Sequence, residues 1–89
     1  MINAIVLLRV RRDCISRVAD ALAEQPGITE VYTVAGQYDL VAIVRAAGDE
    51  QIAEMVTGTL LDIEGLLSSE TLLAFQTRSN FNLAELFGI

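Results

Sequence analysis

The residues best placed to do chemistry lie in the stretch 35-AGQYDLVAIVRA-46. Its turn carries an acid, Asp39, directly beside a phenol, Tyr38. Gly36 permits a positive φ angle and lets another group come close to the backbone. A carboxylate at the start of an apolar strand, beside a buried face, costs free energy unless it is paired or binds a cation. The turn is therefore either structural, with Asp39 accepting N–H groups of its own turn and Tyr38 capping the core, or a binding site.

The remaining side chains exclude most catalytic machinery. The sequence has no histidine, so neither a Ser-His-Asp nor a Cys-His site can form within one chain. It has no lysine, which excludes a Schiff base and a Walker phosphate loop. The lone Cys14 excludes an internal disulfide and, without histidine, the usual zinc sets. Acid–base catalysis by carboxylates stays open, but we expect no catalytic residue, no metal and no cofactor.

Length and composition predict one small domain with more apolar surface than it can hide. The chain has 89 residues, of which 53% are hydrophobic and 20% charged, so a second copy is expected to cover part of it. Its net charge of −6 makes it a poor nucleic-acid binder. The first positive charge follows the N-terminal apolar run, unlike in a signal peptide. No apolar run approaches the roughly 18–20 residues that cross a bilayer, so we expect a cytoplasmic protein.

Periodicity predicts the elements that position the turn. Alternating apolar residues predict strands, and apolar spacings of three, four and seven predict helices. Asp13 and Asp49 are expected to cap the two helices. Gly27 and Gly65 lie 38 residues apart, and each follows a predicted helix and precedes a predicted strand. The two halves of the chain therefore have the same order of elements. The predicted strands cover residues 4–10, 28–35, 38–45 and 66–76, and the helices follow their caps at residues 13 and 49.

The predicted order β-α-β-β-α-β indicates an α+β fold. Two such βαβ units form a ferredoxin-like sandwich, in which both helices cover one face of an antiparallel four-stranded sheet. Along the third strand, Leu40 and Ala42 lie on one face and Val41 and Ile43 on the other, so both faces are apolar. The helices can cover only one. We therefore expect a homodimer whose sheets pack face to face, resembling a dimeric α/β barrel.

The same alternation predicts where the two polar residues of the turn point. Asp39 should share the face of Val41, and Tyr38 should share the face of Leu40.

The chain is expected to divide into a domain over residues 1–78 and a C-terminal tail over residues 79–89. Asn82 with Glu85 three residues later resembles a capping box, which predicts a short helix. The apolar tail either packs on its own domain or reaches a neighbouring dimer.

Three motifs resemble the effector-binding domain of the Lrp/AsnC regulators, which are feast/famine transcription factors. Residues 31-VYTVAGQYDLVAIV-44 are similar to the family's strand, Gly-x-Tyr-Asp-Leu turn and apolar strand. The stretch 65-GLLSSETLLAF-75 resembles Gly-Val-x-x-Thr-x-Thr, with Leu66 for valine, Ser69 for the first threonine and Thr71 for the second. The stretch 26-PGITEVYTV-34 resembles Pro-Gly-Val-x-x-Val. Together the motifs span about residues 4–78.

The resemblance implies a function. Family members carry an N-terminal helix-turn-helix domain, and this chain begins at strand one, so it looks like the stand-alone effector domain. The family's domains dimerise through their sheets and assemble into octamer-like rings, with an amino acid held between dimers. A stand-alone domain would then modulate transcription by mixing with full-length regulators or by sequestering the effector. The resemblance places the effector site at Gly36, Gln37, Tyr38, Asp39, Leu40, Ser69 and Thr71.

A free amino acid suits these residue types. Asp39 can accept a charge-assisted hydrogen bond from the ammonium group. Backbone N–H groups near Gly36, with the hydroxyls of Ser69 and Thr71, can donate to the carboxylate.

Two alternatives share the predicted topology. Small dimeric monooxygenases and isomerases use His, Trp, Asn or Arg in a cleft, but this sequence has no His or Trp, and its asparagines lie near the termini. An amino-acid-binding ACT-like module normally has a glycine-rich loop after strand one. Here Arg11-Arg12-Asp13 stands at that place.

Overall fold

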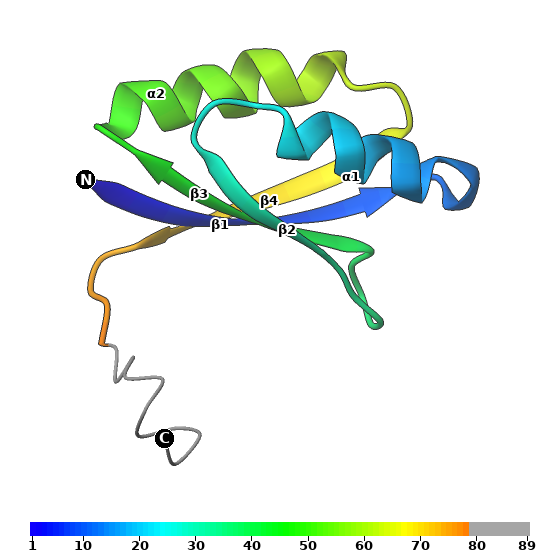
Figure 1. Cartoon of the computed structure of the whole chain (residues 1–89), viewed down its shortest axis with the longest axis horizontal. Coiled ribbons are helices and arrows are strands. Elements are labelled where there is room, and N and C mark those ends of the chain that lie inside the picture. Colours follow the sequence, from blue (N-terminus) through cyan, green and yellow to red (C-terminus); the bar gives the residue numbers. More distant parts are fainter. Residues whose placement is uncertain (79–89) are drawn as a thin grey trace, which may run out of the picture.

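The computed structural model of the chain describes residues 1–78 and shows one antiparallel sheet beneath two helices (Figure 1). The four strands and two α-helices occur in the predicted order β-α-β-β-α-β. A 3₁₀ turn precedes the first helix, and a π-helical turn and a 3₁₀ turn extend the second. The bounds are β1 Ile2–Val10, 3₁₀ turn Arg12–Cys14, α1 Ile15–Ala23, β2 Ile28–Thr33, β3 Leu40–Ala46, α2 Asp49–Glu54, π-helical turn Met55–Thr59, 3₁₀ turn Leu60–Asp62 and β4 Leu66–Ala74.

The sheet has the strand order β2-β3-β1-β4, with β1 and β3 in the centre. All three pairings are antiparallel, and both helices lie on the same face (Figure 1). This confirms the predicted ferredoxin-like α+β fold. The predicted C-terminal helix at Asn82 lies outside the described residues.

One face of the sheet forms the core against the helices. Val6 and Leu8 of β1 are buried there together with Leu40 of β3, and the helices contribute Val18 and Leu22 among others. These strand residues alternate with period two, because successive side chains of a strand point to opposite faces.

The other face of the sheet, called the open face below, has no helix of residues 1–78 over it (Figure 1). The register places Ile5 opposite both Ile43 and Leu72, and Leu7 opposite Val41. Ile5, Leu7, Val41 and Ile43 are only partly buried, and Leu72 is exposed. The open face is therefore apolar along its centre, as the sequence predicts.

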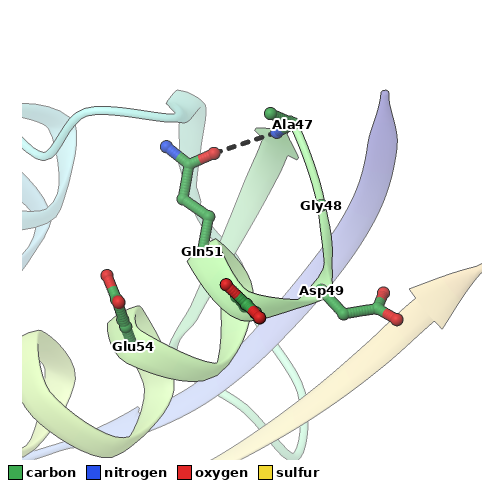
Figure 2. Close-up of a pocket in the computed structure, with 6 residues that line it drawn as sticks. Ala47, Gly48, Asp49, Gln51 and Glu54 are labelled. Atoms are coloured by element: carbon green, nitrogen blue, oxygen red, sulfur yellow. Dashed lines mark hydrogen bonds between the residues drawn. The ribbon is translucent and has the colours of Figure 1, made fainter.

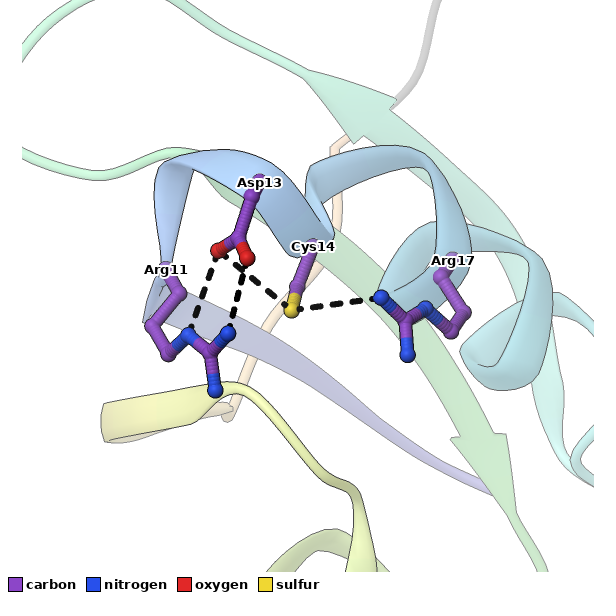
Figure 3. Close-up of polar contacts among 4 residues, drawn as sticks. All are labelled: Arg11, Asp13, Cys14 and Arg17. Atoms are coloured by element: carbon purple, nitrogen blue, oxygen red, sulfur yellow. Dashed lines mark hydrogen bonds and ion pairs between the residues drawn. The ribbon is translucent and has the colours of Figure 1, made fainter.

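Both predicted helix caps are wrong by one residue. Helix α1 begins at Ile15 after the 3₁₀ turn, and no side chain caps it. Asp13 instead forms an ion pair with Arg11 at 2.7 Å (Figure 3). That pairing lowers the pKa of Asp13, chiefly through the hydrogen bond from Arg11. At α2 the cap position is Gly48, in an extended conformation, and Asp49 is the first helical residue.

Gly65 joins the helical layer to β4 at a place that a side chain cannot occupy. Its φ angle is +98°, and its carbonyl accepts a hydrogen bond from the Arg11 N–H at 2.8 Å. A Cβ atom added to Gly65 would lie 2.7 Å from the Cβ of Cys14 and 2.9 Å from its Sγ. Cys14 is itself buried, so it fills the core as a small apolar residue.

Replacing Gly65 with alanine is expected to destabilise the fold by about 2–4 kcal/mol, through backbone strain and overpacking against Cys14. The midpoint of urea unfolding should fall accordingly. Gly58→Ala is the control, because a Cβ there meets nothing within 4 Å. Its stability should be unchanged or higher by up to about 1 kcal/mol. Equal midpoints for Gly65→Ala and the wild type would show that Cys14 yields to the added methyl group.

Candidate functional site

The predicted site begins at the exposed turn between β2 and β3. Gly36 has a φ angle of +145°, and nothing lies within 4 Å of the place its Cβ would take. Gln37 beside it is exposed. The turn is closed by the Val34 N–H, which donates to the Asp39 carbonyl at 3.0 Å. The backbone here is thus open to another molecule, while its base is fixed by hydrogen bonds.

Asp39 is a structural part of the sheet. Its backbone N–H donates to the Leu8 carbonyl at 2.9 Å, and its Oδ2 accepts the Val10 N–H at 2.9 Å. The carboxylate therefore extends the hydrogen bonding between β1 and β3 beyond the start of β3. The Asp39 carboxylate does accept a backbone N–H, but from Val10 of β1 rather than from its own turn. Its Oδ1 receives no hydrogen bond from residues 1–78, so one carboxylate oxygen can still bind a donor.

Tyr38 belongs to a polar cluster at one end of the open face. Its hydroxyl donates to Glu70 Oε2 at 2.5 Å, and the Arg9 guanidinium carbon lies 5.7 Å from its ring centroid. The hydrogen bond to Glu70 raises the pKa of Tyr38. Since Glu70 is opposite Leu7, this cluster lies on the open face. The prediction that Tyr38 shares the face of Leu40 is therefore wrong, because the chain bends at residues 35–37 and 39 before β3 begins.

Leu40 lies inside the core rather than on the surface. It is fully buried and stands opposite Leu8. Its side chain therefore cannot touch a ligand at the turn. It anchors the start of β3 and so holds Asp39 in place.

The two hydroxyl residues of β4 lie on the helix side of the sheet. Ser69 is opposite Leu8 and exposed, and Thr71 is opposite Val6 and partly buried. The Thr71 Oγ1 atom is buried and has no hydrogen-bond partner in the part of the chain that the structure describes. Thr71 lines a groove of about 430 Å³ between α2, the π-helical turn and β4. The other lining residues are Asp49, Ile52, Ala53, Val56, Thr57 and Leu73.

The turn and the hydroxyls are not joined into one pocket within a single copy. Strand β1 lies between β3 and β4, so these strands are about 10 Å apart at the usual spacing. Asp39 and Tyr38 lie together at one end of β3. Ser69 and Thr71 lie across β1 from them, on the helix side. A ligand contacting both groups must therefore bridge two copies or span β1.

Residues that the sequence did not single out complete this picture. Arg9 and Glu70 both contact Tyr38. Glu70 could have been singled out from the sequence, because it is the only charged residue between residues 66 and 77. Ile52 and Val56 line the groove, but only the tertiary structure reveals that they face Thr71.

A second hollow, at the start of α2, is acidic. Gln51 Oε1 accepts the Ala47 N–H at 2.9 Å, and Asp49 extends away from Glu54 (Figure 2). The hollow carries three acids, Asp49, Glu50 and Glu54, and no cationic residue. Across residues 1–78 no group of three or more His, Cys, Asp or Glu side chains is arranged to hold a metal ion. Within the same range no helix is long and apolar enough to cross a membrane.

Comparison with known proteins identifies the family. The model of the Lrp/AsnC ligand binding domain matches residues 3–82. A helix-turn-helix-type transcriptional regulator of Pyrococcus furiosus is 36% identical over 78 residues, which cover 84% of this chain and 52% of that protein. The chain thus spans about half the length of this relative.

Solved structures show the same fold. A protein of Thermus thermophilus matches with a TM-score of 0.85 and 44% identity, over 90% of this chain and all of that one. A transcriptional regulator of Neisseria meningitidis, solved in complex with L-methionine, matches with a TM-score of 0.76 and 15% identity, over 97% of this chain and 59% of that one. With a family model matched over most of its length, the chain belongs to the Lrp/AsnC ligand-binding domain family.

Proposed function

We propose that this chain is an amino-acid-sensing regulatory domain. It binds a small amino acid at an interface between copies and modulates transcription by associating with full-length Lrp/AsnC-type regulators in the cytoplasm. The family assignment supports this proposal, as does the L-methionine in the structure of the Neisseria neighbour. Because the named relatives are transcriptional regulators, we assign the domain a regulatory rather than an enzymatic role.

The observation that carries the proposal is the exposed turn at Gly36 and Asp39. The free Oδ1 of Asp39 suits an ammonium group, because a charge-assisted hydrogen bond is stronger than a neutral one. The open backbone at Gly36 lets a carboxylate approach N–H groups closely. On β4, the Thr71 hydroxyl, which has no partner within residues 1–78, is a further donor. Since β1 separates the two groups within one copy, the site uses the turn of one copy and β4 of another.

The open face supports assembly. Its centre is apolar, with Ile5, Leu7 and Val41, and its rim is polar, with the Arg9–Tyr38–Glu70 cluster at one end. An apolar centre surrounded by polar groups is the usual anatomy of a protein interface. We propose that two copies pack open face to open face as a homodimer, and that dimers assemble further into an octamer-like ring. An effector bound between dimers shifts the population toward the assembly it prefers.

The proposal is tested by light scattering after size exclusion, with and without each of the twenty amino acids. The expected result is a mass above the dimer that changes with one or a few amino acids. Isothermal titration calorimetry on those amino acids then gives the affinity. An assembly indifferent to every amino acid, with no heat of binding, would refute the sensing function.

Ile5→Glu places a carboxylate at the centre of the open face and should weaken the dimer at least about 100-fold, because a buried unpaired charge is costly. Leu61→Glu is the control, since Leu61 is 70% exposed and lies in the helical layer. It should dimerise like the wild type. Sedimentation equilibrium measures both constants. Equal dimerisation of Ile5→Glu and Leu61→Glu would show that the interface lies elsewhere.

Asp39→Asn separates the two roles of this residue. Asparagine can still accept the Val10 N–H, so stability should change little, but it lacks the charge for the ammonium group. Affinity for the effector should fall about 10- to 100-fold, the usual range for losing a hydrogen bond to a charged group. Asp39→Ala should lose both affinity and stability, while Asp20→Asn, an exposed change on α1, should alter neither. Calorimetry and thermal unfolding measure the two effects, and unchanged effector affinity in Asp39→Asn would remove Asp39 from the site.

A further inference from the structure

The groove beside Thr71 has an apolar wall. Among the residues that line it, Ile52 is buried, Val56 is partly buried and Leu73 is 45% exposed. Asp49 is the one charged residue among those of residues 1–78 that line the groove, and it is exposed. The volume of about 430 Å³ lies within the range of roughly 300–1,000 Å³ that is usual for small-molecule sites. The groove therefore suits an apolar part of a ligand better than a charged one.

The chain departs from α-helical geometry where it forms this wall. Helix α2 ends at Glu54, and the π-helical turn Met55–Thr59 supplies two of the lining residues, Val56 and Thr57. The Thr57 hydroxyl donates to the Ala53 carbonyl at 2.7 Å, so its proton is already bonded within the helical layer. Single π-helical turns are rare and are found frequently at functional sites. The shape of the wall thus supports a binding role for the groove.

One polar atom at the groove calls for a partner. The Thr71 Oγ1 atom is buried and makes no hydrogen bond with residues 1–78. A buried hydroxyl that stays unbonded costs free energy, and the carboxylate of a ligand would accept its proton. Thr71 and Leu73 lie two residues apart on the same face of β4, opposite Val6 and Ala4 of β1. A ligand held at Thr71 therefore has the apolar wall directly beside it.

We propose that the effector carries an uncharged aliphatic side chain, in the size range from valine to methionine, and that Val56 and Leu73 select it. This inference rests on the proposed sensing function, in which the ammonium group binds Asp39 of one copy and the carboxylate binds Thr71 of another. The side chain of the effector then lies in the groove of the second copy, against Ile52, Val56 and Leu73. Its removal from water there favours binding in proportion to the apolar area buried.

The charges around the groove disfavour other classes of side chain. An acidic side chain would meet Asp49 in the groove and the acids Glu50 and Glu54 in the adjoining hollow. A cationic side chain can reach Asp49, but that carboxylate is exposed, and exposed ion pairs contribute little. An amide side chain would lie against the apolar wall with its hydrogen bonds unmade, which is costly. The aliphatic amino acids are the class without such a cost.

Calorimetric titration of the wild-type chain with each of the twenty amino acids tests the class of effector. The tightest ligand should be valine, leucine, isoleucine or methionine. Alanine should bind at least about 10-fold more weakly than that ligand, which is the scale for one missing methylene group in an apolar pocket. Tightest binding by an amino acid outside this set would overturn the inference and leave the sensing function in place. No heat of binding with any amino acid would refute both.

Variants of the wall test whether the groove makes this choice. Val56→Asp should weaken the tightest aliphatic ligand at least about 10-fold and strengthen lysine, because it places a carboxylate in the apolar wall. Leu67→Asp is the matched control, since Leu67 is exposed on β4 outside the groove, and it should keep the wild-type preference. Leu73→Ala, at an exposed position, should weaken the aliphatic ligand more than alanine. Circular dichroism verifies folding, and a wild-type preference in both groove variants would overturn the inference.

Discussion

The structure depends on one constraint, which is that its sheet has two apolar faces and helices for only one of them. Val6, Leu8 and Leu40 are buried because α1 and α2 cover their face. Ile5, Leu7 and Val41 alternate with them and are left partly exposed. In a chain of 89 residues no further element among the described residues covers that strip. Function is therefore expected at contacts between copies, where the proposed sensing site and the proposed assembly lie.

In the proposed function, one residue of the turn before β3 serves both the fold and a ligand. Asp39 uses Oδ2 to continue the sheet's hydrogen bonds to β1, which fixes the direction of the carboxylate. A carboxylate held in this way needs little reordering to bind an ammonium group, and such preorganisation favours binding. Leu40 helps to fix the position of Asp39, because its burial in the core holds the start of β3.

The fold is predictable from the sequence because alternation in β1 and β3 and the spacing in the helices follow the simple periods of strand and helix. Prediction fails where local geometry departs from those periods. Simple alternation assigns Tyr38 to the face of Leu40 as though the strand began at residue 38, but a bend intervenes and its hydroxyl reaches Glu70. Residue type predicts Asp13 as a cap, but its carboxylate pairs with Arg11 and a 3₁₀ turn delays the helix.

The candidate site is only partly predictable. Motif matching groups Asp39 with Thr71, although the strand order of the predicted fold already places β1 between them. The groove beside Thr71 depends on the π-helical turn, which no simple periodicity indicates.

The most direct measurement is hydrogen exchange of the wild-type chain, followed by mass spectrometry over a range of protein concentrations. If a second copy covers the open face, side-chain burial should slow exchange across β1 and β3 as concentration rises, while the exposed helical surface of α1 stays unchanged. Exchange in the central strands that does not depend on concentration, together with a monomeric mass, would contradict the pairing of open faces.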